Sequence, residues 1–204
     1  MKAALVRIAA ARTGQKAGHQ GRLLVAIVGA PGAGKSTLAA EMAAQIEGAA
    51  VVPMDGFHLD NAVLSARGLL PRKGAPETYD VAGFAALLPR LQTEAEVVIP
   101  LFDRARDAAI AGAAVIGPST RVLLIEGNYL LLAAGPWAAL HGFWDVTIAL
   151  DVPVPVLEAR LIQRWLDHGL PQDQAEARAF GNDIPNARRV LDGSAPADVV
   201  IRHA

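Results

Sequence analysis

The chain has 204 residues, 52% of them hydrophobic and 19% charged, which is enough apolar material for one substantial folded domain. Its 19 Lys and Arg balance 20 Asp and Glu, so a formal net charge of −1 gives no overall attraction to nucleic acid or to an anionic membrane. The absence of cysteine excludes disulfides, thiolate catalysis and cysteine-ligated zinc, and no apolar run is as long as a membrane span. We therefore expect a cytoplasmic protein whose partner is a small molecule, not nucleic acid or a membrane.

The N-terminal part of the chain predicts a helix and then a strand–loop–helix unit. Residues 1–12 are Ala-rich and amphipathic without the continuous apolar segment of a signal peptide, which predicts a packing helix. Residues 23–28 are an apolar run typical of a buried parallel strand, and residues 36–47 are rich in helix formers. Between them, residues 29–36 read Gly-Ala-Pro-Gly-Ala-Gly-Lys-Ser, the pattern of a phosphate-binding loop.

Each residue type in this loop has a physical role. Glycines lack a Cβ, so the backbone can turn tightly and bring its N–H groups against phosphate oxygens. Lys35 places a positive charge at the β- and γ-phosphates, and Ser36 offers a hydroxyl to Mg²⁺. A helix that begins at the loop adds an N-terminus that favours anions. The predicted phosphate-binding residues are Gly29, Ala30, Pro31, Gly32, Ala33, Gly34, Lys35, Ser36 and Thr37.

The rest of the chain alternates between strand-like and helix-like stretches. Further strands are predicted at 50–53, 96–101, 121–126, 145–150 and 198–202. Helices are predicted near 80–91, 130–140, 153–167 and 175–191. This alternation predicts an α/β fold in which helices cover both faces of a parallel sheet. Two segments rich in Gly and Pro, 55–79 and 103–119, are predicted to leave the core as lids or substrate walls.

Two carboxylates directly follow or end predicted strands. Asp55 comes after the strand at 50–53, where it is a candidate base for an attacking hydroxyl. Glu126 ends the strand at 121–126, where it is a candidate for orienting Mg²⁺ or its waters. Because the carboxyl ends of parallel strands share one edge of a sheet, both are expected beside the phosphate loop.

Several strings resemble a family of P-loop kinases that comprises uridine kinase, phosphoribulokinase and bacterial type I pantothenate kinase. Residues 55–57 (Asp-Gly-Phe) and 72–80 (Arg-Lys-Gly-Ala-Pro-Glu-Thr-Tyr-Asp) resemble pantothenate kinase, and 99–103 (Ile-Pro-Leu-Phe-Asp) resembles the acceptor-pocket segment of uridine kinases. The Glu-Gly at 126–127 is similar to that of all three, and residues 182–186 resemble the adenine-side loop of pantothenate kinase.

This resemblance implies a three-layer P-loop NTPase fold with a mostly parallel five-stranded sheet, a lid and a substrate-wall excursion. It implies one kinase domain over 1–204, with the lid at about 160–178 and Asn186 at the nucleotide. Arg160 and Arg164 are four residues apart and share one helix face, from which they are predicted to clamp the phosphates of ATP. Asp55, Lys35, Arg164 and Arg160 are the predicted catalytic residues. Ser36 and Glu126 are the predicted Mg²⁺ ligands, and relatives of this kind often form homo-oligomers.

The predicted acceptor pocket is polar and of mixed charge. Its predicted lining is Asp55, His58, Arg72, Lys73, Asp103, Arg104, Arg106, Asp107 and Tyr129. Arg104 and Arg106 alternate with Asp103 and Asp107, so on a strand the arginines would face away from the aspartates, and a solvated face is the alternative for Arg106 and Asp107. Mixed charge suits a hydroxylated or anionic small molecule better than an apolar one. The three tryptophans are predicted to pack in the core or the lid.

The sequence thus predicts an ATP- and Mg²⁺-dependent phosphotransferase acting on a hydroxyl of a small molecule. Strings at 54–58 and 126–129 resemble short bacterial kinases labelled "fructose transport system kinase", which implies a sugar acceptor. Residues 73–76 lack the ribose-binding Asp of uridine kinases, and 102–107 lack a His of pantothenate kinase. Nucleoside, pantothenate and nucleotide acceptors remain alternatives. A GTPase switch is a further alternative, although the chain has no Asn-Lys-x-Asp string.

Overall fold

A five-stranded parallel sheet forms the centre of the computed structural model, which describes residues 1–14 and 21–202. The strand order is β2-β5-β1-β6-β7, and every neighbouring pair is parallel. The strands are β1 (Leu23–Gly29), β2 (Ala49–Pro53), β5 (Val122–Gly127), β6 (Val146–Asp151) and β7 (Val199–Arg202). All residues of β1 and β5 are buried, as expected for the apolar central strands of a parallel sheet.

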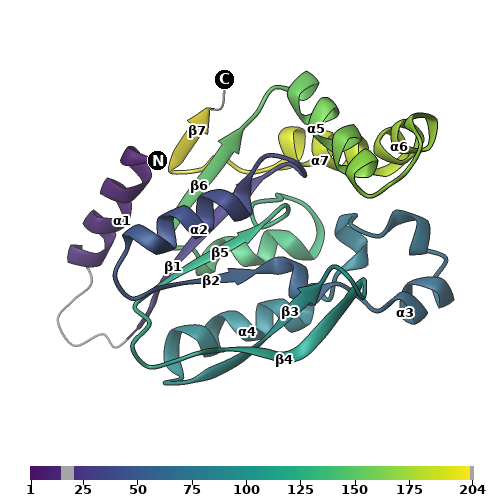
Figure 1. Cartoon of the computed structure of the whole chain (residues 1–204). Helices are drawn as coiled ribbons and strands as arrows, with labels where there is room; N and C mark the ends of the chain where they lie inside the picture. The colour runs from purple at the N-terminus through teal and green to yellow at the C-terminus, as the bar shows by residue number, and fades with distance from the viewer. Residues whose placement is uncertain (15–20, 203–204) are drawn as a thin grey trace.

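Helices flank this sheet on both sides (Figure 1). α1 (Lys2–Gly14) and α2 (Lys35–Gln45) both pack on the sheet and meet where Gln45 contacts Met1. α4 (Val81–Thr93) packs against a 3₁₀ segment, Gly135–Phe143, and α5 (Val154–Asp167) packs against α7 (Ile184–Gly193). Two short helices, α3 (Asn61–Ala66) and α6 (Gln172–Arg178), lie toward the right of Figure 1. The predicted α/β fold is confirmed.

One predicted excursion is instead a β-hairpin. β3 (Val97–Asp103) pairs antiparallel with β4 (Ala108–Ile116), so the strand predicted at 96–101 lies outside the main sheet. The segment 103–119 was hard to recognise because Ala and Gly dominate β4, and these residues have weak strand preference. A bulge falls at Pro100, which has no N–H for the ladder. Residues 104–107 form the turn, so the alternation of side chains on a strand does not apply to Arg104 and Arg106.

Two predicted helices also differ. The helix expected at 130–140 is the 3₁₀ segment Gly135–Phe143, and the helix expected at 175–191 is divided into α6, a π segment and α7. The π segment, Ala179–Asp183, ends just before Pro185. Proline cannot donate a hydrogen bond to the carbonyl four residues earlier, so the carbonyl of Gly181 lacks the usual α-helical donor. That carbonyl accepts a hydrogen bond from Arg72 at 3.4 Å instead.

Close backbone packing explains two glycines of the recognised strings. Gly56 lies in a 3₁₀ turn, Met54–Phe57, where a Cβ would collide with the carbonyl oxygen of Pro100. A Cβ at Gly127 would lie 2.6 Å from the Cβ of Met54. Both glycines therefore let the turn that carries Asp55 sit directly against the end of β5 and the hairpin. In the described part of the chain, no helix combines the length and apolar character needed to cross a bilayer.

Candidate active site

The phosphate loop occupies the carboxyl end of β1 and leads directly into α2. Gly32 and Gly34 have φ angles of +80° and +92°, a region that only glycine adopts without strain. Lys35 begins α2, and its Nζ donates a hydrogen bond to the carbonyl of Ala30 at 3.1 Å. The side chain is enclosed, with Lys35 only 8% exposed. Burial lowers the pKa of Lys35, and the nearby charge of Glu126 opposes this shift.

Ser36 and Glu126 form a hydrogen-bonded pair of oxygen donors beside the loop. The Ser36 hydroxyl donates to Oε1 of Glu126 at 3.1 Å. Glu126 is placed there by the sheet register, which sets it opposite Ile27 of β1 and Pro53 of β2. Burial raises the pKa of Glu126, whereas the charge of Lys35 lowers it. A hydroxyl and a carboxylate are hard oxygen donors of the kind that Mg²⁺ prefers. Among the described residues, no cluster of three or more His, Cys, Asp or Glu forms a protein-only metal site.

Asp55 lies one strand away from the loop, between two different partners. Its Oδ1 accepts a hydrogen bond from the hydroxyl of Tyr79 at 3.5 Å. Its Oδ2 accepts one from Nη2 of Arg104, also at 3.5 Å. Burial and the adjacent Asp55 carboxylate raise the pKa of Tyr79 well above its ordinary value, so the Tyr79 hydroxyl remains a donor. Oδ1 of Asp55 is therefore bound by a buried tyrosine, and Oδ2 is bound by an exposed arginine.

His58 and Tyr79 form an aromatic wall next to Asp55. Their rings stack with centroids 4.1 Å apart, and the His58 ring also meets Phe102 at 4.8 Å. The His58 side chain is 9% exposed, and its Nδ1 has no hydrogen-bond partner among the described residues. Burial lowers the pKa of His58 to about 4, so the ring is neutral near pH 7. His58 thus contributes shape and a polar edge to the site, and no charge.

Lys73 holds the wall together. Its Nζ donates to Oδ1 of Asn61 and to the carbonyl of Asp107, both at 2.7 Å, and pairs with Oδ1 of Asp107 at 2.9 Å. An ammonium group has three N–H donors, and these contacts use all of them. The Lys73 ammonium also lies 5.1 Å from the Phe102 ring centroid. The residue predicted to contact substrate is therefore a clamp between the segment after α3 and the hairpin turn.

The C-terminal helices supply the opposite wall. Arg164 of α5 pairs with Asp183 at 3.3 Å, and Trp165 donates to the same carboxylate at 2.6 Å. The guanidinium groups of Arg164 and Arg178 lie 5.5 Å and 5.2 Å from the Trp165 ring centroid. Arg178 also donates to the carbonyl of Pro71 at 3.0 Å. These contacts connect the helices that would form a lid to the segment that carries Lys73.

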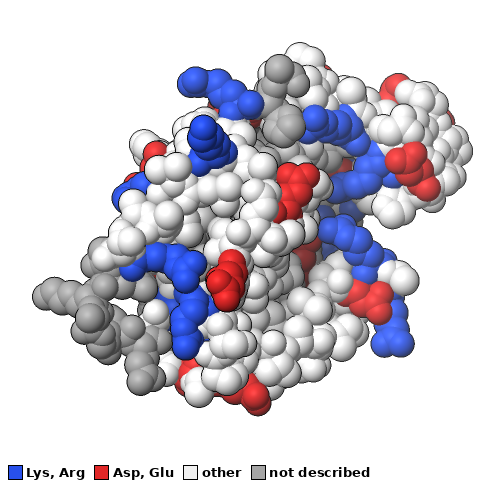
Figure 2. All heavy atoms as spheres, turned by 60° about the vertical axis from the view of Figure 1, so that its left-hand side comes forward, with Lys and Arg blue, Asp and Glu red and all other residues white. Residues whose placement is uncertain are grey.

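One cavity of about 820 Å³ joins these parts. Figure 2 shows Lys and Arg side chains on both sides of the recess between the C-terminal helices and the rest of the molecule. The sequence-predicted residues that line the cavity are Pro31, Gly32, Gly34, Lys35, Ser36, Thr37, Asp55, His58, Lys73, Arg104, Asp107, Glu126, Arg164 and Asn186. The structure therefore brings together the phosphate loop, both strand-end carboxylates, Arg164 and most of the acceptor residues.

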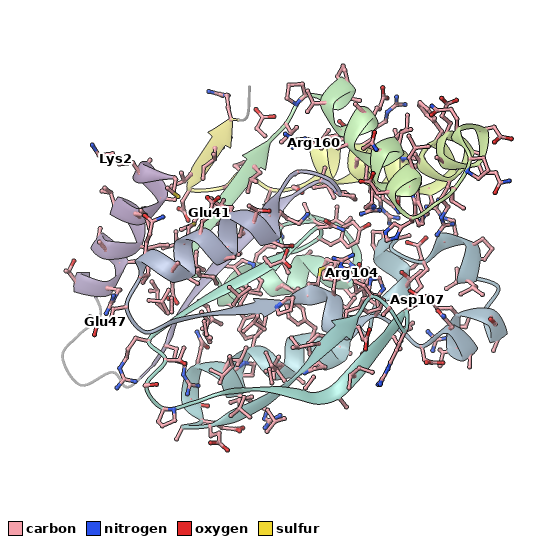
Figure 3. All side chains as sticks on the ribbon, viewed as in Figure 1. Lys2, Glu41, Glu47, Arg104, Asp107 and Arg160 are labelled. Carbon is pink, nitrogen blue, oxygen red and sulfur yellow. The ribbon has the colours of Figure 1, made fainter. Side chains whose placement is uncertain are left out.

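Eight predicted site residues do not line this cavity: Gly29, Ala30, Ala33, Arg72, Asp103, Arg106, Tyr129 and Arg160. Asp103 accepts hydrogen bonds from the backbone N–H groups of Ala105 and Arg106 and so caps the hairpin turn. Tyr129 is fully buried and donates to the carbonyl of Gly74 at 2.6 Å. Arg160 donates to the carbonyl of Gly32 at 3.2 Å, and Figure 3 shows it on α5 above the loop.

Sequence reasoning missed several lining residues. They are Leu70, Gly74, Tyr79, Phe102, Gly127, Asn128, Trp165, His168, Leu170, Arg178 and Asp183. Tyr79 and Phe102 lie within strings that had been recognised, so the signal was present but was not assigned to individual side chains. Trp165 was expected only to pack, and its position between Arg164 and Arg178 depends on how α5 and α6 meet.

Among proteins built around a phosphate-binding loop, kinases need room for a second substrate beside the transferred phosphate. The cavity extends from the loop past Asp55 to Phe102 and Arg104, which provides that room. The fold and the site together define a P-loop kinase.

Comparison with known proteins agrees with this class. A crystal structure of a putative fructose transport system kinase from Silicibacter sp. TM1040 is 56% identical, covers 98% of both chains and superposes with a TM-score of 0.92. The uncharacterized protein YggC of Escherichia coli is 36% identical over 92% of this chain and 80% of its own length. A putative uridine kinase, C227.14, of Schizosaccharomyces pombe is 34% identical over 90% of this chain and 84% of its own length. No family model matches the chain.

The chain belongs to the P-loop kinase family that includes uridine kinases, pantothenate kinases and phosphoribulokinases. It is a phosphotransferase.

Proposed function

We propose that this kinase transfers the γ-phosphoryl group of Mg²⁺-bound ATP to a hydroxyl of a small polar molecule. The observation that carries the proposal is that Asp55, the phosphate loop and the Ser36–Glu126 pair all line one cavity. In the transfer, the acceptor oxygen bonds to the γ-phosphorus, and the bond to the β,γ-bridging oxygen breaks. Asp55 takes the hydroxyl proton, and the products are ADP and a phosphate monoester.

The residues of the chain divide this work between binding and orientation. Lys35 and the loop N–H groups would hold the β- and γ-phosphates, and Asn186 would lie on the nucleotide side. Ser36 and Glu126 would hold Mg²⁺ or its waters, and the ion would supply charge neutralisation on the phosphates. Arg164 would stabilise the charge on the transferred group from the side of α5. Most of the rate enhancement would come from positioning and fixed charge.

We further propose that residues 1–204 act as one kinase domain with its lid at about 160–178. The contact from Arg178 to Pro71 supports a lid that reaches over the acceptor wall. A homo-oligomeric state and a cytoplasmic location stay predictions.

For the acceptor, a sugar is one candidate class, because the solved relative is named a putative fructose transport system kinase. A nucleoside or pantothenate would follow from other relatives, which are described as a putative uridine kinase and as pantothenate kinases. The polar and aromatic lining around Asp55 and His58 supports a hydroxylated acceptor of any of these kinds.

An ATP-consumption screen over sugars, nucleosides, pantothenate and small hydroxy acids tests the function. With an accepted substrate, Asp55→Asn should lower kcat by about 100- to 10,000-fold, the usual contribution of a general base, and should leave ATP binding intact. Transfer that survives in this variant at the wild-type rate would show that the base is assigned wrongly. Preferential binding and hydrolysis of GTP, with no effect of any acceptor, would instead favour a nucleotide switch.

A further inference from the structure

We infer that the acceptor of this kinase is an anion, in which a carboxylate or phosphate lies a few bonds from the phosphorylated hydroxyl and is bound by Arg104. This inference rests on the proposed function and adds the chemical class of the second substrate. It follows from the charges around the acceptor half of the cavity.

Arg104 is a cation with unused binding capacity at the reacting end of the cavity. It is the first residue of the hairpin turn, and Figure 3 shows it in the middle of the molecule, inward of Asp107. Its side chain is 69% exposed, although Arg104 lines the cavity. Within residues 1–14 and 21–202, its one polar contact is the 3.5 Å hydrogen bond to Oδ2 of Asp55. A guanidinium group has five N–H donors, so most of them remain available to a ligand.

The other cations near this part of the cavity already contact other protein groups. All three donors of Lys73 are used by Asn61 and Asp107. Arg106 pairs with Asp103 at 3.5 Å and does not line the cavity. Arg164 and Arg178 belong to the opposite wall, where Asp183 and Trp165 hold them. Arg104 is therefore the cation of the described acceptor wall that can bind substrate directly.

Binding of an acceptor hydroxyl at Asp55 would affect the hydrogen bond between Arg104 and Asp55. To give its proton to Asp55, the acceptor hydroxyl must approach a carboxylate oxygen, and Oδ2 is the oxygen that faces Arg104. A neutral acceptor would compete with Arg104 for this oxygen and would leave the guanidinium without a counter-charge. An anionic acceptor would give Arg104 a new partner at the same moment, with the geometry that guanidinium groups favour for carboxylate and phosphate. His58 is neutral near pH 7, so it adds no second positive charge for an anionic acceptor.

The test compares acceptors that differ mainly in charge. Three suitable pairs contain a carboxylate: glycerate and glycerol, gluconate and sorbitol, and pantothenate and pantothenyl alcohol. A fourth pair, fructose 6-phosphate and fructose, contains a phosphate, so the set distinguishes the two kinds of anion. Each is assayed for ATP consumption and for the shift in Tm that it causes in the presence of a non-hydrolysable ATP analogue. We expect the anionic member of at least one pair to exceed its neutral counterpart by tenfold or more in kcat/KM.

Arg104→Gln should then lower kcat/KM for that anion by about 10- to 100-fold, as expected for loss of a charge-assisted hydrogen bond, mainly through a higher KM. Arg106→Gln is the matched control, because it removes the same charge from the same turn on a side chain that does not line the cavity. The inference is wrong if no anion exceeds its neutral counterpart in either assay, or if the Arg104 and Arg106 variants behave alike. Transfer to neutral sugars or nucleosides in that case would leave the proposed kinase function intact. The proposed function itself would be wrong if the Asp55→Asn variant were as active as wild type.

Discussion

The hydroxyl of Tyr79 donates a hydrogen bond to Asp55 at 3.5 Å, while the Tyr79 ring stacks on His58 with centroids 4.1 Å apart. Tyr79 therefore touches the proposed base through its hydroxyl and is fixed in place through its ring. Backbone pairing adds to this, because His58 and Tyr79 form an isolated antiparallel bridge. The pair links the turn after β2 to the segment before α4, which are far apart in the chain.

Tyr79→Phe should lower kcat about 3- to 10-fold and leave the KM for ATP unchanged, because it removes one hydrogen bond to Asp55 and keeps the ring stack. Steady-state kinetics with saturating acceptor measure this. Tyr129→Phe is the control: it loses a 2.6 Å hydrogen bond to Gly74 in the core, so it should lower the free energy of unfolding by about 1–2 kcal/mol. A Tyr79→Phe enzyme with unaltered kcat would show that Tyr79 does not position Asp55.

Arg164 and Arg160 should differ sharply in their effect on catalysis. Arg164 lines the cavity, whereas Arg160 is exposed and donates to the carbonyl of Gly32. Arg164→Gln is expected to lower kcat by at least about 100-fold, in keeping with arginines that stabilise a transferring phosphoryl group. Arg160→Gln should change kcat by less than about threefold, since its contact is a single exposed hydrogen bond. Comparable losses in the two variants, measured in the same assay, would contradict this assignment.

Lys35→Ala should abolish the stabilisation of the protein by Mg²⁺-ATP. At a nucleotide concentration of about 100 times Kd, binding stabilises the folded state by about 2.7 kcal/mol, or roughly 5–10 °C in Tm for a chain of this size. Loss of the buried Lys35 ammonium should remove most of that shift. Lys2→Ala, on the exposed side of α1, is a matched control that should keep it. A full Tm shift in the Lys35 variant would mean that the loop does not bind the nucleotide through this residue.

The parts of the fold that could be predicted from the sequence are those encoded by local pattern. The phosphate loop could be recognised because its glycines, Lys35 and Ser36 occupy fixed positions between an apolar run and a helix. Asp55 and Glu126 could be expected beside it because they follow or end strands of the same parallel sheet. These predictions needed only the strand ends, and the order β2-β5-β1 brings those ends together.

What could not be predicted depends on contacts between distant segments. Lys73 lines the cavity, but its contact with Asp107 could not be foreseen, because Asp107 lies 34 residues later in the turn of a hairpin that the Ala-rich sequence did not reveal. Tyr129 resembled a pocket residue until the fold placed its hydroxyl on Gly74. In both cases the composition of the segment was read correctly as polar, and the direction of the side chain was decided by tertiary packing.

Lys73→Met tests the clamp. The variant keeps an apolar chain against Phe102 and loses the hydrogen bonds to Asn61 and Asp107. We expect it to lower the free energy of unfolding by about 1–3 kcal/mol, the range for buried hydrogen bonds of a charged group. Chemical denaturation with intrinsic tryptophan fluorescence measures this. If stability is unchanged and only the KM for the acceptor rises, Lys73 contacts substrate after all.

The pH dependence of stability should report the burial of His58. In the unfolded chain its pKa is the ordinary 6.5, and burial lowers the pKa in the folded protein to about 4. Between these values the unfolded state binds more protons than the folded state, so stability falls as the pH falls from about 6.5 to about 4. Above this window and below it the contribution of His58 is constant. The total change is on the order of 3 kcal/mol, which is the difference between the two pKa values multiplied by the free energy of about 1.36 kcal/mol per pKa unit.

His58→Phe isolates this effect, because it removes the titrating group and keeps an aromatic ring between Tyr79 and Phe102. The free energy of unfolding of the variant relative to wild type should therefore rise steadily as the pH is lowered from 6.5 to 4. His168→Gln, which removes an exposed histidine, is the control. A parallel profile for His58→Phe would mean that the folded protein accommodates a charged His58, and the aromatic wall beside Asp55 would then carry a positive charge at low pH.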